Sequence, residues 1–243
     1  MANIKYNSVV LSQASSLEKA VEFLRNTLGD DAWLWLYKLS EAASSIRENC
    51  KGDDWAVQID NMEIPIESPK HLKPKKLAGN LKMYVSISME GSGEAWKNNE
   101  DCIKSLRFKV EVLEKDKNDA QKFFHTGFHI DKMDSKDTTS EMHPLYHVHF
   151  LNDSQIEGTD VLAMDVPRLM HHPVDVFLGI LLVYANYNQT GYNKLLQDGY
   201  FMGLCRESAK HILAPYYLSL SKVLWTDDSV TEYEKALCPY LKA

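Results

Sequence analysis

The stretch LKMYVSISME, residues 81–90, and the stretch LRFKVEVLE, residues 106–114, decide the fold. In both, apolar residues occupy every second position and polar residues lie between them. A period of two is typical of strands that bury one face and leave the other polar, as in an antiparallel sheet. A shorter strand is expected at 55–59. The middle of the chain is therefore predicted to form an antiparallel sheet.

Helical patterns precede this sheet. Apolar residues recur at helical spacing on both sides of Gly29, which predicts two helices separated by a tight turn. Ser15 and Glu18 form an S-x-x-E capping box, where the first helix is expected to begin. Asp30 or Asp31 can cap the second helix. Two helices joined so closely are expected to pack as an antiparallel pair.

Helical patterns also follow the sheet. Pro173 suits a first helical position, and residues 174–187 are apolar nearly all round, which predicts a central helix packed on the sheet. Further helices are expected at 192–204 and 208–224, the last kinked or restarted at Pro215.

Together these patterns predict an α+β fold in one domain, residues 1–243. Its parts are an N-terminal helix pair in 1–50, an antiparallel meander of about five strands in 53–152, and C-terminal helices in 173–240 packed on the sheet. A chain of this length buries enough surface to fold without disulfides or a structural metal.

The charge balance limits the partners. The net charge is −7, which disfavours broad nucleic-acid binding because such binding needs a basic surface. The exception is the lysine cluster of segment 69–76, PKHLKPKK, from Lys70 to Lys76. It can be a nucleic-acid contact or simply a solvated loop.

Cysteine spacing and hydropathy bear on location. The four cysteines are widely spaced, and the N-terminal residues lack the pattern of a signal peptide. The longest apolar run, 176–185, is shorter than the ~20 residues that a bilayer requires. We therefore expect a soluble, cytoplasmic protein with reduced thiols and no membrane role.

Histidines cluster in one part of the chain, because seven of the nine fall between His125 and His172. If FHTGFHID (124–131) and HPLYHVHFL (143–151) are paired strands, alternation turns their histidines to one face and their apolar residues to the core.

Such a face could hold a metal. We predict His129, Asp131, His147 and His149 as ligands, with His125 or His143 as substitutes. Imidazole and carboxylate suit Zn²⁺, Fe²⁺ or Mn²⁺, and a metal-bound water can attack a phosphodiester. Without a metal, paired histidines can act as general acid and base. The alternative is an ordinary solvated sheet face, since H-x-H on a strand is a weak signal.

A second polar cluster follows, in DVPRLMHHPVD (165–175). Arg168, His171 and His172 precede the apolar helix, where cationic groups and a helix N-terminus suit an anion such as phosphate. The alternative is a surface pair between Asp165 and Arg168.

The segments HPLYHVHF and PRLMHHPVD, followed by an apolar helix, resemble an uncharacterised bacterial domain-of-unknown-function family with a His-Pro-x-x-His-x-His segment. The matching residues are His143, Pro144, His147, His149, Arg168 and Pro173. The resemblance covers about a third of the chain and implies a bacterial origin, but no activity.

Two functions stay open, and no catalytic residue is assigned. Since no Walker A loop, G-x-G-x-x-G or G-x-S-x-G occurs, the chain can be an accessory or interaction subunit of a multi-protein bacterial system. Its partner would be another protein, with aromatic anchors drawn from this set: Trp33, Trp35, Tyr37, Tyr216 and Tyr217. The alternative is a metal-dependent hydrolase acting on a phosphodiester or nucleotide through the histidines.

Overall fold

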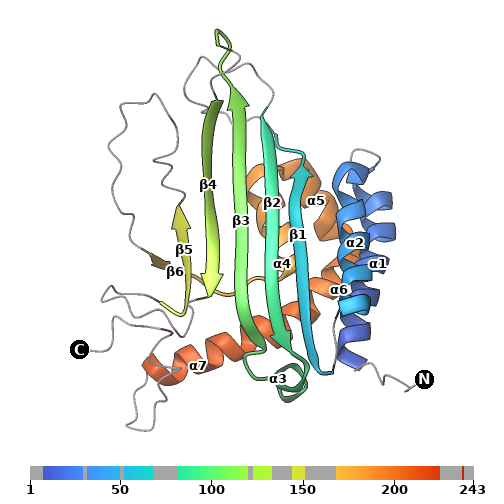
Figure 1. The fold of residues 1–243 in the computed structure, drawn as a ribbon, viewed down its shortest axis with the longest axis vertical. Helices are drawn as coiled ribbons and strands as arrows, with labels where there is room; N and C mark the ends of the chain where they lie inside the picture. The colour runs from blue at the N-terminus through green and yellow to red at the C-terminus, as the bar shows by residue number, and fades with distance from the viewer. Residues whose placement is uncertain are drawn as a thin grey trace.

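A computed structural model describes residues 8–29, 32–49, 52–67, 81–119, 123–132, 144–150, 168–224 and Leu237. These residues form the predicted α+β fold, with an antiparallel sheet between an N-terminal helix pair and C-terminal helices (Figure 1). The strands pair in chain order, each antiparallel to the next: β1 (Asp54–Ile64), β2 (Lys82–Ser92), β3 (Ile103–Lys115), β4 (Phe123–Lys132), β5 (Tyr146–Phe150) and β6 (Leu169–Met170).

The helices lie to one side of this sheet. Figure 1 shows α4, α5 and α6 behind the sheet, α1 and α2 beside β1, and α7 across one end. Their bounds are α1 (Ser8–Leu28), α2 (Trp33–Asn49), α3 (Gly93–Asn98), α4 (Val176–Tyr187), α5 (Gln189–Gln197), α6 (Gly199–Ser208) and α7 (Ala214–Leu224). No helix in the described ranges has the length and apolar character needed to cross a bilayer.

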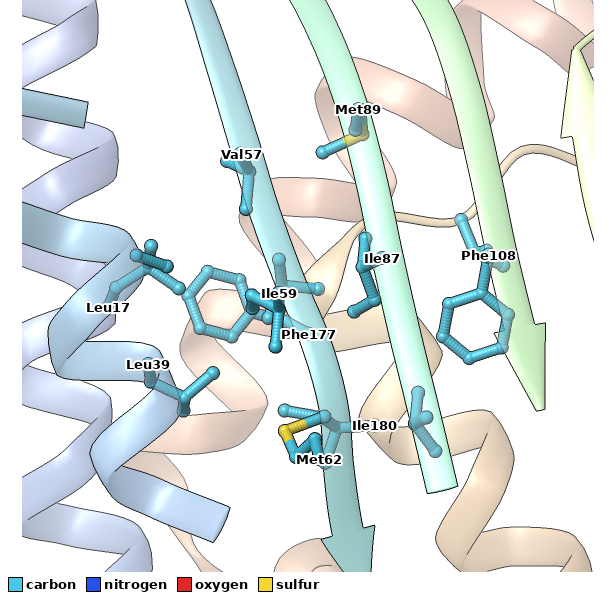
Figure 2. Close-up of a cluster of buried hydrophobic side chains, with 14 of the residues drawn as sticks. Leu17, Leu39, Val57, Ile59, Met62, Ile87, Met89, Phe108, Phe177 and Ile180 are labelled. Atoms are coloured by element: carbon cyan, nitrogen blue, oxygen red, sulfur yellow. The ribbon is translucent and has the colours of Figure 1, made fainter. Parts of the chain in front are cut away.

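The core lies between the sheet and the helices. In β2 the predicted apolar positions are buried and alternate with polar residues, so the sequence period matches the sheet. Figure 2 shows how the helices meet this layer: Leu17 and Leu39 point toward Ile59 from α1 and α2, and Phe177 reaches it from α4. Burial of such side chains contributes ~1.5–3 kcal/mol each to folding.

Helix α4 approaches the sheet closely at one glycine. A Cβ on Gly179 would lie 2.3 Å from the ring of Phe108, so only glycine lets the helix pack at this distance. The predicted helix start at Pro173 is wrong by three residues, because α4 begins at Val176. Asp175 is its N-cap and accepts a hydrogen bond from the Leu178 N–H at 2.9 Å.

The N-terminal capping box is also wrong. Ser15 lies inside α1, which is already helical at Ser8. Glu18 instead accepts a hydrogen bond of 2.7 Å from Arg47 on α2, and so links the two helices. The predicted helix stop is confirmed, because Gly29 follows the last residue of α1 with a φ of 91°.

One C-terminal helix breaks where no break was predicted. The helix expected over 192–204 is two helices, because Asp198 ends α5 and caps α6. The restart expected at Pro215 is confirmed to within one residue, because α7 begins at Ala214 after a π-helical turn, Ala209–Leu213.

The sheet is slightly larger than expected. β1 extends well beyond the predicted 55–59, and its register with β2 shifts around Asn61, which has a φ of 51°. The described part of the chain has six strands rather than about five, since the two-residue β6 pairs with β5. The lysine cluster Lys70–Lys76 lies outside the described residues.

Candidate acid–base site on the histidine face

Strands β4 and β5 bring the histidines together. They pair antiparallel, with His129 opposite His149 and Asp131 opposite His147. Directly opposed side chains share one face of a sheet, with Cβ atoms ~5 Å apart. The predicted pairing of the two histidine segments is therefore confirmed.

The polar side of β3, β4 and β5 is termed the histidine face here. Residues Ile130 and Tyr146, which alternate with the histidines, are buried on the core side. The strand registers give the members of the histidine face as Arg107, Lys109, Glu111, His125, Gly127, His129, Asp131, His147 and His149.

Asp131 lies between an arginine and a histidine. Its Oδ2 is 3.1 Å from Nε2 of His129, and its Oδ1 is 3.6 Å from Nε of Arg107. A carboxylate this close favours a proton on Nε2 of His129, so that Nδ1 carries the lone pair. In this tautomer, Nδ1 is the nitrogen of His129 that can accept a proton.

The other two histidines stand beside this pair. The rings of His129 and His149 meet edge to face, with centroids 5.0 Å apart and an interplanar angle of 88°. His147 is only 3 % exposed, and its Nδ1 is 3.1 Å from the carbonyl oxygen of Pro144. Since a carbonyl only accepts, Nδ1 of His147 is the donor in this contact.

Strand β3 adds charged groups beside the histidines. Lys109 is opposite His129 in the register, and its Nζ is 2.8 Å from Oε1 of Glu111. The same oxygen is 3.3 Å from Nε2 of His125. The histidine face therefore contains two histidine–carboxylate pairs: His129 with Asp131, both on β4, and His125 on β4 with Glu111 on β3.

Arg168 comes close to this face. Leu169 lies opposite Val148, and Met170 lies opposite His147. Arg168 directly precedes β6, so the arginine of the predicted anion cluster begins the segment that pairs with the strand of His147 and His149.

His171 and His172 lie elsewhere. His171 donates its backbone N–H to the carbonyl of Tyr146 at 3.0 Å, and the ring centroid of His172 is 6.4 Å from that of Tyr217 on α7. Burial lowers the pKa of His172 to about 4, helped by the neighbouring His171, and burial also lowers the pKa of His171. Both rings are thus uncharged near neutral pH. Asp165 lies outside the described residues.

The metal prediction is not resolved by this geometry. Among the described residues, no three histidine, cysteine, aspartate or glutamate side chains are arranged to hold a metal ion. His143, one of the substitute ligands, lies outside the described residues. Zinc, iron or manganese on the histidine face therefore stays a prediction.

The described cysteines have no part in such a site. Cys102 and Cys205 are buried in the core. Burial raises the pKa of each thiol to about 12, so neither forms a thiolate near neutral pH.

The contribution of β3 to the histidine face was not predicted from the sequence. Arg107, Lys109 and Glu111 were predicted on the polar side of a strand, but were not connected with the histidines. The alternating pattern supplied that signal, while the register that pairs Lys109 with His129 is a tertiary property.

No family model, curated protein or solved structure matches this chain. Its function has to be inferred from the chemistry of the histidine face.

Proposed function

We propose that the histidine face hydrolyses a phosphodiester or nucleotide by general acid–base catalysis, with His129 as base and His149 as acid. The observation that carries this proposal is the contact of His129 with Asp131 on one side and with the ring of His149 on the other. Of two imidazoles in contact near neutral pH, one can donate a proton as the acid while the other accepts a proton as the base.

In the proposed step, Nδ1 of His129 takes a proton from water as the water oxygen bonds to phosphorus. The bond from phosphorus to the leaving oxygen breaks, and His149 gives that oxygen a proton. Asp131 stabilises the imidazolium that forms on His129, as the carboxylate does in a catalytic triad. A second proton transfer through solvent restores both rings.

Cations near the pair suit an anionic substrate. Lys109 is directly opposite His129, and Arg168 directly precedes β6, which pairs with the strand of His149. Arg107 and Lys109 are each balanced by a carboxylate, so a protonated His149 adds the charge that favours phosphate.

The test is turnover of bis(p-nitrophenyl) phosphate and of nucleoside 3′,5′-cyclic monophosphates. His129→Ala and His149→Ala are expected to lower kcat by ~10²–10⁴-fold. Gln58→Ala is the control, since it changes the same side of the sheet on β1, away from the histidines. No turnover of any substrate by the unaltered protein, or full activity in both variants, would refute the proposal.

A divalent metal on the same imidazoles is a related route, because Zn²⁺, Fe²⁺ and Mn²⁺ all accept such ligands. Elemental analysis of the untagged protein separates the two. A stoichiometric metal that disappears in the His147→Ala/His149→Ala variant supports the metal route. Turnover that persists in a chelator supports the route without a metal.

The second candidate is an interaction subunit of a multi-protein system. Its support is the surface of α2, where Trp33 is 50 %, Leu34 64 % and Tyr37 39 % exposed. Trp33 also lines a groove of about 680 Å³ between α1 and α2. Aromatic residues are favoured anchors at interfaces. Trp35 and Tyr216 are buried in the core and cannot take this part.

The interaction proposal is tested by purifying the tagged chain from its source cells and identifying what accompanies it. A Trp33→Ala/Tyr37→Ala variant should lose a stoichiometric partner while it unfolds at the same temperature. If the variant still retains the partner, this surface of α2 is not the binding site.

A further inference from the structure

Glycine stands at the centre of the histidine face. On β4 the positions turned to this face are His125, Gly127, His129 and Asp131 in succession. Gly127 therefore leaves a position without a side chain between His125 and His129. A glycine inside a strand costs ~0.5–1 kcal/mol relative to alanine, so its presence needs a physical reason.

The backbone does not supply that reason. The register between β3 and β4 runs without a shift from Arg107 opposite Asp131 to Lys115 opposite Phe123, so Gly127 is not part of a bulge. Within such a ladder the backbone is extended, which suits any residue. The remaining role of a strand glycine is to let another group approach the backbone closely.

The surroundings of Gly127 indicate what that group is. Glu111 lies directly opposite Gly127, and its carboxylate is shared by Lys109 and His125. Carboxylates accept hydrogen bonds from the hydroxyls of a ribose, as acidic residues do in dinucleotide sites. Gly127 is only partly buried.

The spacing fits a nucleotide. Gly127 lies two residues from His129 and two from His125, which is ~7 Å in each direction along an extended strand. A phosphate at His129 and Lys109 would put the sugar over Gly127 and the base toward His125. These three moieties follow one another in the same order in a nucleoside monophosphate.

We infer that the substrate of the histidine face is a ribonucleotide whose ribose lies over Gly127 and donates hydroxyl hydrogen bonds to Glu111. This inference rests on the proposed function for the location of the phosphate, and it narrows a phosphodiester or nucleotide to a ribonucleotide. The competing explanation is that Gly127 only makes room for the Glu111 carboxylate. Binding measurements distinguish the two.

The probes are adenosine 5′-monophosphate, its 2′,3′-dideoxy analogue and inorganic phosphate, with binding measured by calorimetry. The unaltered protein should bind the ribonucleotide about tenfold more tightly than the dideoxy analogue. Gly127→Val should weaken ribonucleotide binding about tenfold or more, and change phosphate binding by no more than about twofold. Because valine favours strands, the unfolding temperature of the Gly127→Val variant should not fall.

Glu111→Gln is the second variant, because it keeps the shape of the side chain and removes the charge. This variant should bind the ribonucleotide more weakly and the dideoxy analogue with unchanged affinity, so that the preference for the ribonucleotide disappears. The inference is overturned if the unaltered protein does not distinguish the two nucleotides. It is also overturned if Gly127→Val binds the ribonucleotide as tightly as the unaltered protein does. A Gly127→Val variant that unfolds at a lower temperature because valine displaces the Glu111 carboxylate from Lys109 and His125 would overturn it too.

Failure of the inference and failure of the proposed function give different results. Selective ribonucleotide binding without any hydrolysis refutes the acid–base proposal and leaves the inference intact. Turnover of bis(p-nitrophenyl) phosphate without a preference for the ribonucleotide does the reverse. If the unaltered protein binds none of the three probes, the inference is overturned.

Discussion

Asp131 and His129 lie two residues apart on β4, with Oδ2 of the carboxylate 3.1 Å from Nε2 of the ring. Strand alternation puts both on one side of the sheet, and the contact orients the ring without any other element. A carboxylate in this relation to a histidine fixes the tautomer and the orientation of the ring.

The first prediction concerns this contact. Asp131→Asn keeps the shape of the side chain but removes the charge that stabilises a protonated His129. We expect kcat for phosphodiester hydrolysis to fall ~10–100-fold, as for other residues that orient a reacting histidine. Steady-state kinetics of the variant beside Gln58→Ala give the comparison. Equal activity of the two variants would mean that Asp131 does not assist His129.

The sheet was predictable because its signal is local. Residues 81–90 alternate strictly, and the period of two fixes which side of the strand is buried. The same alternation correctly turned His129 and His149 to one side once their strands were paired. The partners on β3 were not predictable, since no local pattern encodes the register between distant strands.

Helix ends were less predictable than helix faces. Ser15 and Glu18 match a capping box, yet Glu18 contacts Arg47 of α2 and the helix runs through both residues. The start of α4 was placed at Pro173 because a first helical position does not need the N–H that proline lacks, whereas Asp175 supplies the side-chain cap. In each case a tertiary contact or a competing cap outweighed a short motif.

The second prediction tests the packing of α4 on the sheet. Gly179→Ala puts a methyl group 2.3 Å from the ring of Phe108, and overpacking of this kind costs ~1–3 kcal/mol of unfolding free energy. Gly203→Ala is the matched control, because nothing lies within 4 Å of the new methyl in α6. That variant should gain ~0.4–1 kcal/mol. Chemical denaturation measures both, and a stable Gly179→Ala would show that α4 can shift.

The third prediction concerns acid. Burial lowers the pKa of His172 from its usual 6.5 to about 4, so in this interval the unfolded chain binds a proton that the folded chain does not. Unfolding free energy therefore falls as the pH drops from 6.5 to 4. His172→Gln should flatten this part of the profile, while Tyr217→Phe, which keeps the neighbouring ring, should not. Parallel profiles for His172→Gln and the unaltered protein would contradict the burial of this imidazole.

The fourth prediction concerns the contacts that hold β5 in place. Nζ of Lys132 is 2.8 Å from Oδ2 of Asp101, and the Tyr146 hydroxyl donates to the same carboxylate at 2.8 Å. Both charged side chains are largely buried, at 12 % and 15 % exposure. Because Tyr146 directly precedes His147, this cluster helps to set the register that carries the β5 histidines.

Asp101→Ala leaves the ammonium of Lys132 buried without this carboxylate, which we expect to cost ~3–5 kcal/mol. Adding Lys132→Met removes the unpaired ammonium and should recover much of the lost free energy of unfolding. Glu63→Ala, which breaks the exposed pair with Lys82, is the control and should cost no more than ~1 kcal/mol. Denaturant titrations of the unaltered protein and the three variants measure these free energies of unfolding. If Asp101→Ala and Glu63→Ala lose the same small free energy, the cluster does not fix β5. The alignment of His147 and His149 would then depend on the backbone hydrogen bonds of the sheet alone.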